Sequence, residues 1–195
     1  MPHEWLVIGL AGIAWAIFNG GYVVWLSFGP KVLVEQGAAA LPAASIISVG
    51  SWIMILSSAA CGQIVNRFGH GQTILAIATG TALVALSLLA VPGAGLVASL
   101  LFGVIGMAPA GIIFALASKA VAPERRAFGM GVFFAIYYAI VSITPPLAGW
   151  IFDRTGSATG AIVFGACLFL LVLPTTVLFK LLRTAPRGMV LQEAA

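Results

Sequence analysis

The chain has 195 residues, of which 62% are hydrophobic and only 7% are charged, and its formal net charge is +4. About 25% of the residues in an ordinary soluble domain are charged, so this composition excludes a water-soluble enzyme or binding domain. In so apolar a chain the basic excess is an orientation signal for membrane insertion, and it does not indicate nucleic-acid binding.

Six apolar runs occupy most of the chain, and each is close to the ~20 residues that a helix needs to cross a bilayer core of ~30 Å. The first run is too long for a secretory signal and is interpreted as a span. We therefore predict an all-α polytopic membrane protein, with residues 1–195 as a single six-helix transmembrane domain. The expected helices are at about 5–28, 43–64, 72–91, 95–117, 128–149 and 160–182, with a cytoplasmic tail at 183–195.

The first run carries uncharged polar and aromatic residues on one face. Asn19, Tyr22 and Trp25 follow one another at a spacing of three residues, which places them along one stripe of a helix. A side-chain amide or phenol in lipid needs hydrogen-bond partners, so this stripe should face the bundle interior or a wet cavity. Contact with a substrate and simple interhelical packing are both compatible with the pattern.

The second and fifth runs end in the same eight-residue word, G-x-x-x-[N/D]-R-x-G, at residues 62–69 and 149–156. Each copy follows the second run of a set of three, so an odd number of crossings separates them and places them on opposite faces of the membrane. This arrangement predicts a 3+3 inverted repeat, an architecture typical of transporters. The motif residues are Gly62, Asn66, Arg67, Gly69, Gly149, Asp153, Arg154 and Gly156.

The arginine of each word is expected just past a helix end, where a cation favours the negative pole of the helix and can reach carbonyls of an adjacent helix. The flanking glycines permit a close helix approach and a tight turn. Such a contact can latch one conformation and release in another. A simple topology anchor explains the same residues.

The fourth and fifth runs contain prolines, at Pro109 and at Pro145 and Pro146. Each proline removes a helix hydrogen bond and tends to kink the helix. Bent helices suit gating between two states, although a static kink is also compatible. The fifth run adds Tyr137 and Tyr138 as polar aromatic residues at depth.

The basic residues predict the orientation, because short cytoplasmic loops retain Lys and Arg during insertion. Only Lys31 and Arg154 belong to the odd-numbered loops. The other seven are Arg67, Lys119, Arg125, Arg126, Lys180, Arg183 and Arg187. We expect a multi-pass protein of the inner (plasma) membrane with both termini in the cytoplasm.

At membrane depth, the predicted membrane-spanning segments contain none of the charged residues or histidines that enzymatic catalysis would need. The carboxylates and cations all fall in predicted loops or termini, and the two histidines, His3 and His70, are at the N-terminus and in a loop. No embedded nucleophile has a base beside it, and no metal-ligand cluster is present. We predict no enzyme activity, no metal and no cofactor.

At the repeated word the chain resembles the major facilitator superfamily, whose six-helix halves carry G-x-x-x-D-R-x-G-R-[K/R] between their second and third helices. Gly62, Arg67 and Gly69 match, while Asn66 replaces the aspartate and His70-Gly71 replaces the two basic residues. The resemblance continues through Pro123-Glu124-Arg125-Arg126 and through Pro146-x-x-Gly149-x-x-x-Asp153-Arg154-x-Gly156. These motifs follow the order of one half, and the degenerate loop and short basic tail are more similar to the C-terminal half.

The resemblance implies that the first and fourth helices line a central cavity, with Asn19, Tyr22 and Met107 near substrate. Tyr138 of the fifth run is a further candidate for substrate contact. A full member has two such halves, so a second six-helix half is expected, from a homodimer or a separate chain.

The function expected from these features is transport of a small solute by alternating access, as a half-length secondary transporter in the lipid bilayer. One alternative is a six-helix substrate-binding subunit of an ATP-driven vitamin importer. Another is an inactive truncated membrane protein. With no ionisable group at depth, the sequence favours neither an anionic nor a cationic substrate.

Overall fold

The structure is a computed structural model that describes residues 2–184, and these residues form helices joined by short connections. Six helical segments are long and apolar enough to cross a membrane, which confirms the predicted all-α polytopic fold. The elements are α1 (Pro2–Glu35), α2 (Ala40–Phe68), α3 (Gly71–Leu89), α4 (Gly95–Leu101), the π-helix η1 (Phe102–Gly106), α5 (Ala110–Ala120), the 3-10 turn η2 (Pro123–Arg125), α6 (Arg126–Thr155) and α7 (Ala158–Thr184). Together α4, η1 and α5 make the fourth span.

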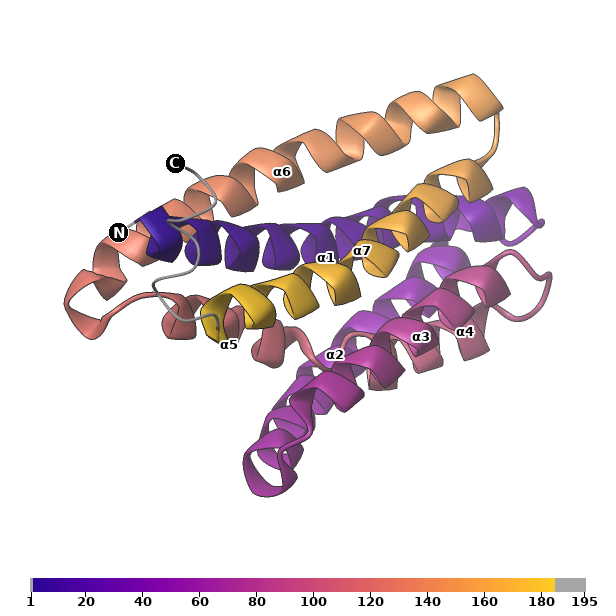
Figure 1. Ribbon diagram of the computed structural model, residues 1–195. Helices are drawn as coiled ribbons and strands as arrows, with labels where there is room; N and C mark the ends of the chain where they lie inside the picture. The colour runs from indigo at the N-terminus through magenta and orange to yellow at the C-terminus, as the bar shows by residue number, and fades with distance from the viewer. Residues whose placement is uncertain (1, 185–195) are drawn as a thin grey trace.

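Consecutive spans run in opposite directions, and the start of α1 and the end of α7 lie at the same end of the bundle (Figure 1). This end, called the terminal end below, also carries the α2–α3 connection and η2. The first three spans and the last three therefore have opposite polarity. Their contacts correspond as well, because α1 packs on α7 and α6 in the way that the fourth span packs on α3 and α2. The molecule is a 3+3 inverted repeat.

The helices continue beyond the apolar runs that predicted them. With 34 residues, α1 is about 50 Å long, well over the hydrocarbon thickness of ~30 Å. It therefore continues through Gly29 and Pro30, which the sequence suggested as a connection, and includes Lys31 and Glu35. Apolar composition marks only the part of a helix that meets lipid, whereas backbone hydrogen bonding extends the helix into the aqueous layer.

Helix α1 is the centre of the bundle, and it is the most buried span. Small residues allow its neighbours to approach. A Cβ added to Gly20 would lie 3.1 Å from Thr144 Oγ1 of α6, and one added to Gly21 would lie 2.5 Å from a ring carbon of Phe169 in α7. Because lipid provides no hydrophobic drive for association, such close van der Waals contact is the main source of cohesion.

The end of α1 also stabilises the start of α7 through Glu35. The Ala158 backbone N–H donates to Glu35 Oε1 at 2.8 Å, and the Ser157 hydroxyl donates to Glu35 Oε2 at 3.2 Å. A carboxylate at this position satisfies an orphan N–H of the first turn and interacts favourably with the positive pole of α7. One turn earlier, Lys31 Nζ lies 4.6 Å from the ring centroid of Phe152, so α1 is also tied to α6.

We expect Glu35→Ala to lower the stability of the folded bundle by about 1 kcal/mol, the typical value of an N-cap. The Glu35 side chain is solvent-exposed, which keeps the effect at this modest level. Thermal unfolding in detergent micelles measures it. Glu124→Ala, which removes an exposed carboxylate from η2, is the control. Equal losses in the two variants would show that Glu35 contributes only its charge.

A second tight contact joins α2 to the fourth span. The Ser99 hydroxyl donates to the Ile46 carbonyl oxygen at 2.6 Å and accepts from the Gly50 N–H at 3.0 Å. Next to this pair, Gly103 approaches Gly50 so closely that a Cβ on Gly103 would collide with the Gly50 carbonyl oxygen. The two backbones are thus in direct contact, which only glycine permits at these positions.

Candidate functional site

The fourth span is interrupted at mid-length. The π-helix η1 follows α4 directly, and residues 107–109 form a turn before α5 begins. The Met107 N–H donates to the Phe102 carbonyl five residues earlier at 2.9 Å, and the Ala108 N–H donates to the Ile105 carbonyl at 3.2 Å. Pro109 contributes no N–H. The sequence predicted a kink at Pro109 within one helix, and the structure shows a break between η1 and α5 instead, whereas α6 runs as one helix through Pro145 and Pro146.

A hydroxyl from α2 satisfies one carbonyl of the interrupted segment. The Ser57 hydroxyl donates to the Gly103 carbonyl oxygen at 2.7 Å. The α-helical donor to Gly103 would be the N–H of Met107, four residues further along, but this N–H donates to the Phe102 carbonyl and is not available to Gly103. Irregular backbone inside a membrane requires such replacement partners, and it is tolerated where it is buried in protein or borders a cavity. π-Helical turns of this kind are frequent at functional sites.

Phe102 is the aromatic centre of the interrupted segment. The ring of Trp25 stacks on it with centroids 4.2 Å apart, and the ring of Tyr22 lies parallel at 6.5 Å. Phe169 of α7 approaches edge-on at 5.7 Å. The Tyr22–Trp25 part of the predicted stripe therefore faces the bundle interior, as expected. Phe102 could not be predicted as a site residue, because one apolar residue in an apolar run does not reveal which side chains it will contact.

The four predicted substrate residues are distributed over this region. Asn19 is half-buried, and its amide N–H donates to the Trp15 carbonyl of its own helix at 2.8 Å. Tyr22 packs beside Phe102, and Met107 is buried in the turn after η1. Tyr138 of α6 is 63% exposed, so it lies outside the core. The substrate role of these four residues stays a prediction.

Tyr138 is connected to α1 through an aromatic cluster that links three spans. The Tyr138 ring lies 4.8 Å from that of Tyr137, which lies 6.2 Å from Trp15 of α1. Trp15 in turn meets Phe114 of α5 edge-on at 5.3 Å. Asn19 donates to the backbone carbonyl of the same Trp15, one turn earlier in α1. Trp15 and Phe114 were not predicted as site residues.

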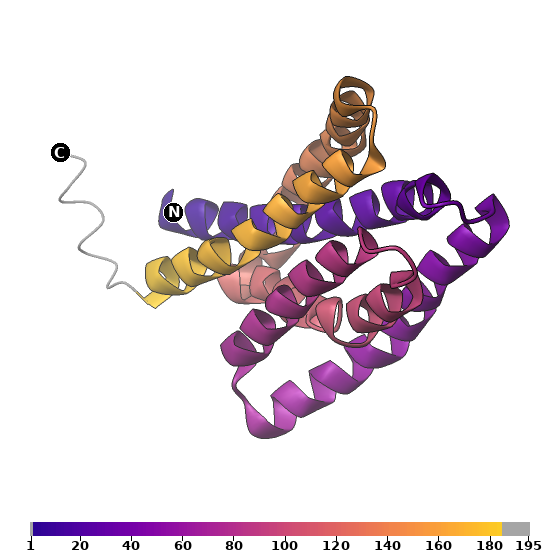
Figure 2. The same ribbon diagram turned by 90° about the vertical axis from the view of Figure 1, so that its right-hand side faces the viewer.

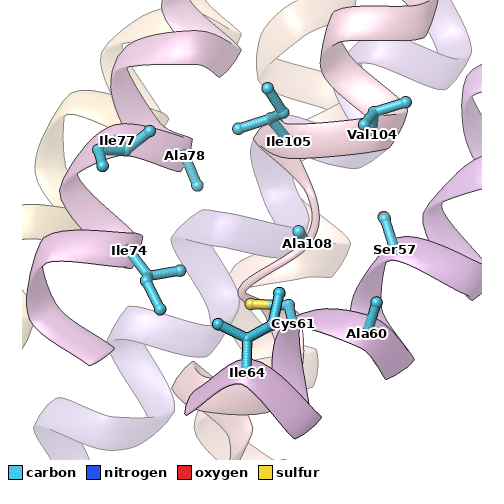
Figure 3. A pocket seen from close by; sticks show the side chains of 10 residues that line it. All are labelled: Ser57, Ala60, Cys61, Ile64, Ile74, Ile77, Ala78, Val104, Ile105 and Ala108. Atoms are coloured by element: carbon cyan, nitrogen blue, oxygen red, sulfur yellow. The ribbon is translucent and has the colours of Figure 1, made fainter. Parts of the chain in front are cut away.

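A hollow of about 330 Å³ lies between α2, α3 and the interrupted segment (Figure 3). Its walls are almost wholly apolar, with Cys61 and Ile64 on α2, Ile74 and Ile77 on α3, and Ile105 following Val104 on η1. None of the four predicted substrate residues lines it. The interrupted segment therefore contacts the aromatic residues of α1 through Phe102 and borders the apolar hollow through Val104 and Ile105.

In both copies of the repeated word the predicted turn is present, but the arginine does not lie where it was predicted. Gly69 and Gly156 have φ of 72° and 67°, and each ends its helix in a conformation that glycine adopts without strain. Arg67 and Arg154 lie in the last turns of α2 and α6 and not past the helix ends, because both helices extend beyond their apolar runs. Each guanidinium lies over an aromatic ring of its own helix, at 5.4 Å from Phe68 and 5.5 Å from Trp150.

The remaining motif residues do not pack closely against neighbouring helices. A Cβ added to Gly62 or Gly149 would meet no atom within 4 Å, so the close helix approach expected at these glycines is not made within residues 2–184. Asn66 and Asp153 are exposed at opposite ends of the bundle. Arg187, with the predicted tail from residue 185 onward, lies outside the described residues, whereas Arg183 belongs to α7.

The chain matches no protein-family model, no curated protein and no solved structure. The class of the protein therefore follows from its fold. The described residues form an all-α, multi-pass membrane protein, with six helices that are long and apolar enough to span the bilayer. The interrupted fourth span and its aromatic surroundings make up the candidate site.

Proposed function

We propose that the protein is a half-length secondary transporter of the major facilitator type, which moves a small solute across the inner membrane by alternating access. The observation that supports this most is the interrupted fourth span at the centre of a 3+3 inverted repeat. In transporters with inverted repeats, the substrate site lies near the bilayer midplane, where discontinuous helices provide irregular backbone. Asn19, Tyr22, Met107 and Tyr138 are the side chains proposed to meet the solute.

A second six-helix half would complete the transporter. The least buried spans are α2 and α6, which occupy equivalent places in the two repeats. In the middle of α6, Tyr138 and Ser142 are both exposed and one turn apart. Polar groups at this depth are unfavourable against lipid, so this face supports a partner or a wet cavity in front of it. The open faces at Gly62 and Gly149 support the same arrangement.

The proposed orientation places both termini in the cytoplasm. Within residues 2–184, the cations at the terminal end are Arg67, Lys119, Arg125, Arg126, Lys180 and Arg183. Lys31 and Arg154 lie at the opposite end. This asymmetry is the positive-inside pattern, and we infer that the terminal end faces the cytoplasm.

Uptake into proteoliposomes tests the proposed function. Purified protein is reconstituted and exposed to a panel of radiolabelled small solutes, with empty liposomes as the background. Saturable uptake of one solute, together with crosslinked dimers in the same preparation, is the expected result. Saturable uptake by protein that crosslinks only as monomer would refute the partner requirement. Tight solute binding by the monomer without uptake would favour the vitamin-importer subunit, and neither binding nor uptake would favour an inactive protein.

For the solute identified in this way, we expect Asn19→Ala to raise the apparent KM about threefold to tenfold, the equivalent of one hydrogen bond. Ser87→Ala is the matched control, since Ser87 also donates to a carbonyl one turn earlier in its own helix, at 2.9 Å, but belongs to α3, outside the predicted substrate residues. Uptake kinetics at equal amounts of reconstituted protein provide the measurement. An unchanged KM for Asn19→Ala would assign the residue to helix packing.

A further inference from the structure

The terminal end of the bundle contains two adjoining hollows with basic walls. One, of about 290 Å³, lies between the start of α1 and the ends of α5 and α7, and its polar residues are His3, Glu4, Lys119 and Arg183. The other, of about 200 Å³, lies between α3, α5 and α7, and Lys119 and Lys180 are at its rim. Lys119 lines both hollows, so they form one continuous surface, called the basic cleft below.

The cations of the basic cleft have more positive charge than the local carboxylates can neutralise. Within residues 2–184 the one ion pair is Arg125–Glu4, with Nη1 and Oε2 2.9 Å apart. Glu4 is therefore already engaged by a cation that lines neither hollow. Lys119, Lys180 and Arg183 have no carboxylate partner in the described part of the chain. Lys119 and Arg183 line the first hollow, and Lys119 and Lys180 line the second, so each hollow has two uncompensated positive charges.

The second hollow changes from polar to apolar along its walls. Gln72 and Thr176, whose side chains lie 3.5 Å apart, provide hydrogen-bonding groups beside the two lysines. Away from them the half-buried side chains of Val65 and Ile112 line the hollow, and most of its exposed wall is apolar. The lysines stand at the ends of apolar spans, which is the depth of the lipid headgroups, and their long aliphatic stems can follow the apolar wall while the ammonium groups reach the interface.

We propose that the basic cleft binds an anionic phospholipid, with the phosphodiester between Lys119 and Lys180 and an acyl chain along the apolar wall of the second hollow. Basic pockets between helices at this depth suit lipid phosphates. A free inorganic phosphate would use the charges but leave the apolar wall unmatched. A zwitterionic lipid would match the wall but bring its own cation to a surface that already has an excess of them. This inference does not depend on the transport function.

Thermal unfolding in mixed micelles tests the proposal. Purified protein is heated in detergent that contains either phosphatidylglycerol or phosphatidylcholine at equal mole fraction, and in lipid-free detergent with millimolar inorganic phosphate. Phosphatidylglycerol is expected to raise the Tm of the wild-type protein by on the order of 5 °C more than phosphatidylcholine. Inorganic phosphate should leave the Tm unchanged. Equal shifts with the two lipids, or a shift of the same size with inorganic phosphate, would overturn the lipid assignment.

The double variant Lys119→Gln, Lys180→Gln locates the site. It should lose the extra shift given by phosphatidylglycerol, whereas the control Arg67→Gln, Arg126→Gln should keep it. The control removes the same charge from the same end of the bundle, at exposed residues that line neither hollow. A shift retained by the lysine variant, or lost equally by both, would contradict the site. If the double variant fails to fold, each single lysine variant should show about half of the wild-type shift, and two full shifts would refute the proposal.

Discussion

Replacing Gly103 with alanine is expected to destabilise the bundle by about 3 kcal/mol, the upper part of the range for overpacking a well-packed interior. The added Cβ would collide with the Gly50 carbonyl oxygen and lie 2.7 Å from Gly50 Cα. Both atoms belong to backbone, so no rotamer change relieves the overlap. The fourth span would have to move away from α2, and the hydrogen bonds of Ser57 and Ser99 across this contact would be lost with it.

Gly80→Ala is the matched control for this substitution. Gly80 is a helical residue of α3 with a negative φ, and a Cβ there would meet no atom within 4 Å. Alanine has the higher helix propensity, so the control should be neutral or slightly stabilising. Thermal unfolding of both variants in detergent compares them. If the Tm of Gly103→Ala falls no further than that of Gly80→Ala, the backbone contact between α2 and the fourth span is not present in the folded protein.

The second large effect is a complete difference in membrane sidedness between two equivalent positions. Asn66 and Asp153 occupy the same place in the two copies of the repeated word, and both are exposed. They lie in the last turns of α2 and α6, two helices that end on opposite sides of the bundle (Figure 1). In a background with Cys61 and Cys167 replaced by alanine, Asp153→Cys is expected to react with a membrane-impermeant maleimide in intact cells. Asn66→Cys should react only after the membrane is permeabilised, because the cation-rich end stays in the cytoplasm.

Two further single cysteines calibrate the labelling. Ala39→Cys, in the α1–α2 connection, should label together with Asp153→Cys, and Arg126→Cys, at the start of α6, should label together with Asn66→Cys. Labelling of Asn66 and Asp153 from the same compartment would exclude the inverted repeat. The opposite sidedness for both pairs would keep the repeat and reverse the proposed orientation.

The number and order of the spans could be predicted from the sequence, but the ends of the helices could not. Hydropathy reports where a segment meets lipid, and six such segments fix the topology. At Pro30 and Arg67, in contrast, the helix continues into the aqueous layer, where composition carries no such constraint. Glu35 was placed in a loop by its charge, yet it caps α7, a partner 123 residues away that no local pattern indicates.

The candidate site could be predicted only at prolines and glycines, because these residues determine the local backbone conformation by themselves. Pro109 indicated an irregularity in the fourth span, although only a kink was expected, and the glycines at 69 and 156 indicated the turns. The stacking of Trp25 on Phe102 and the hydrogen bond from Ser57 to Gly103 depend on how helices distant in sequence pack together. The chain contains many aromatic residues and serines in its apolar runs, and the sequence pattern does not show which of them will contact one another.

The two ends of α1 are held in different ways by the same neighbours, and this has a mechanical consequence. At the terminal end the His3 imidazole contacts the Leu182 carbonyl of α7 at 2.7 Å and Glu4 pairs with Arg125, while at the far end Glu35 holds the first turn of α7. Helix α7 packs against α1 (Figure 2), and a helix fastened to its neighbour near both ends resists shear along it. These contacts oppose sliding of α1 along α7, so we expect bending at residues 102–109, where the helical ladder is already open.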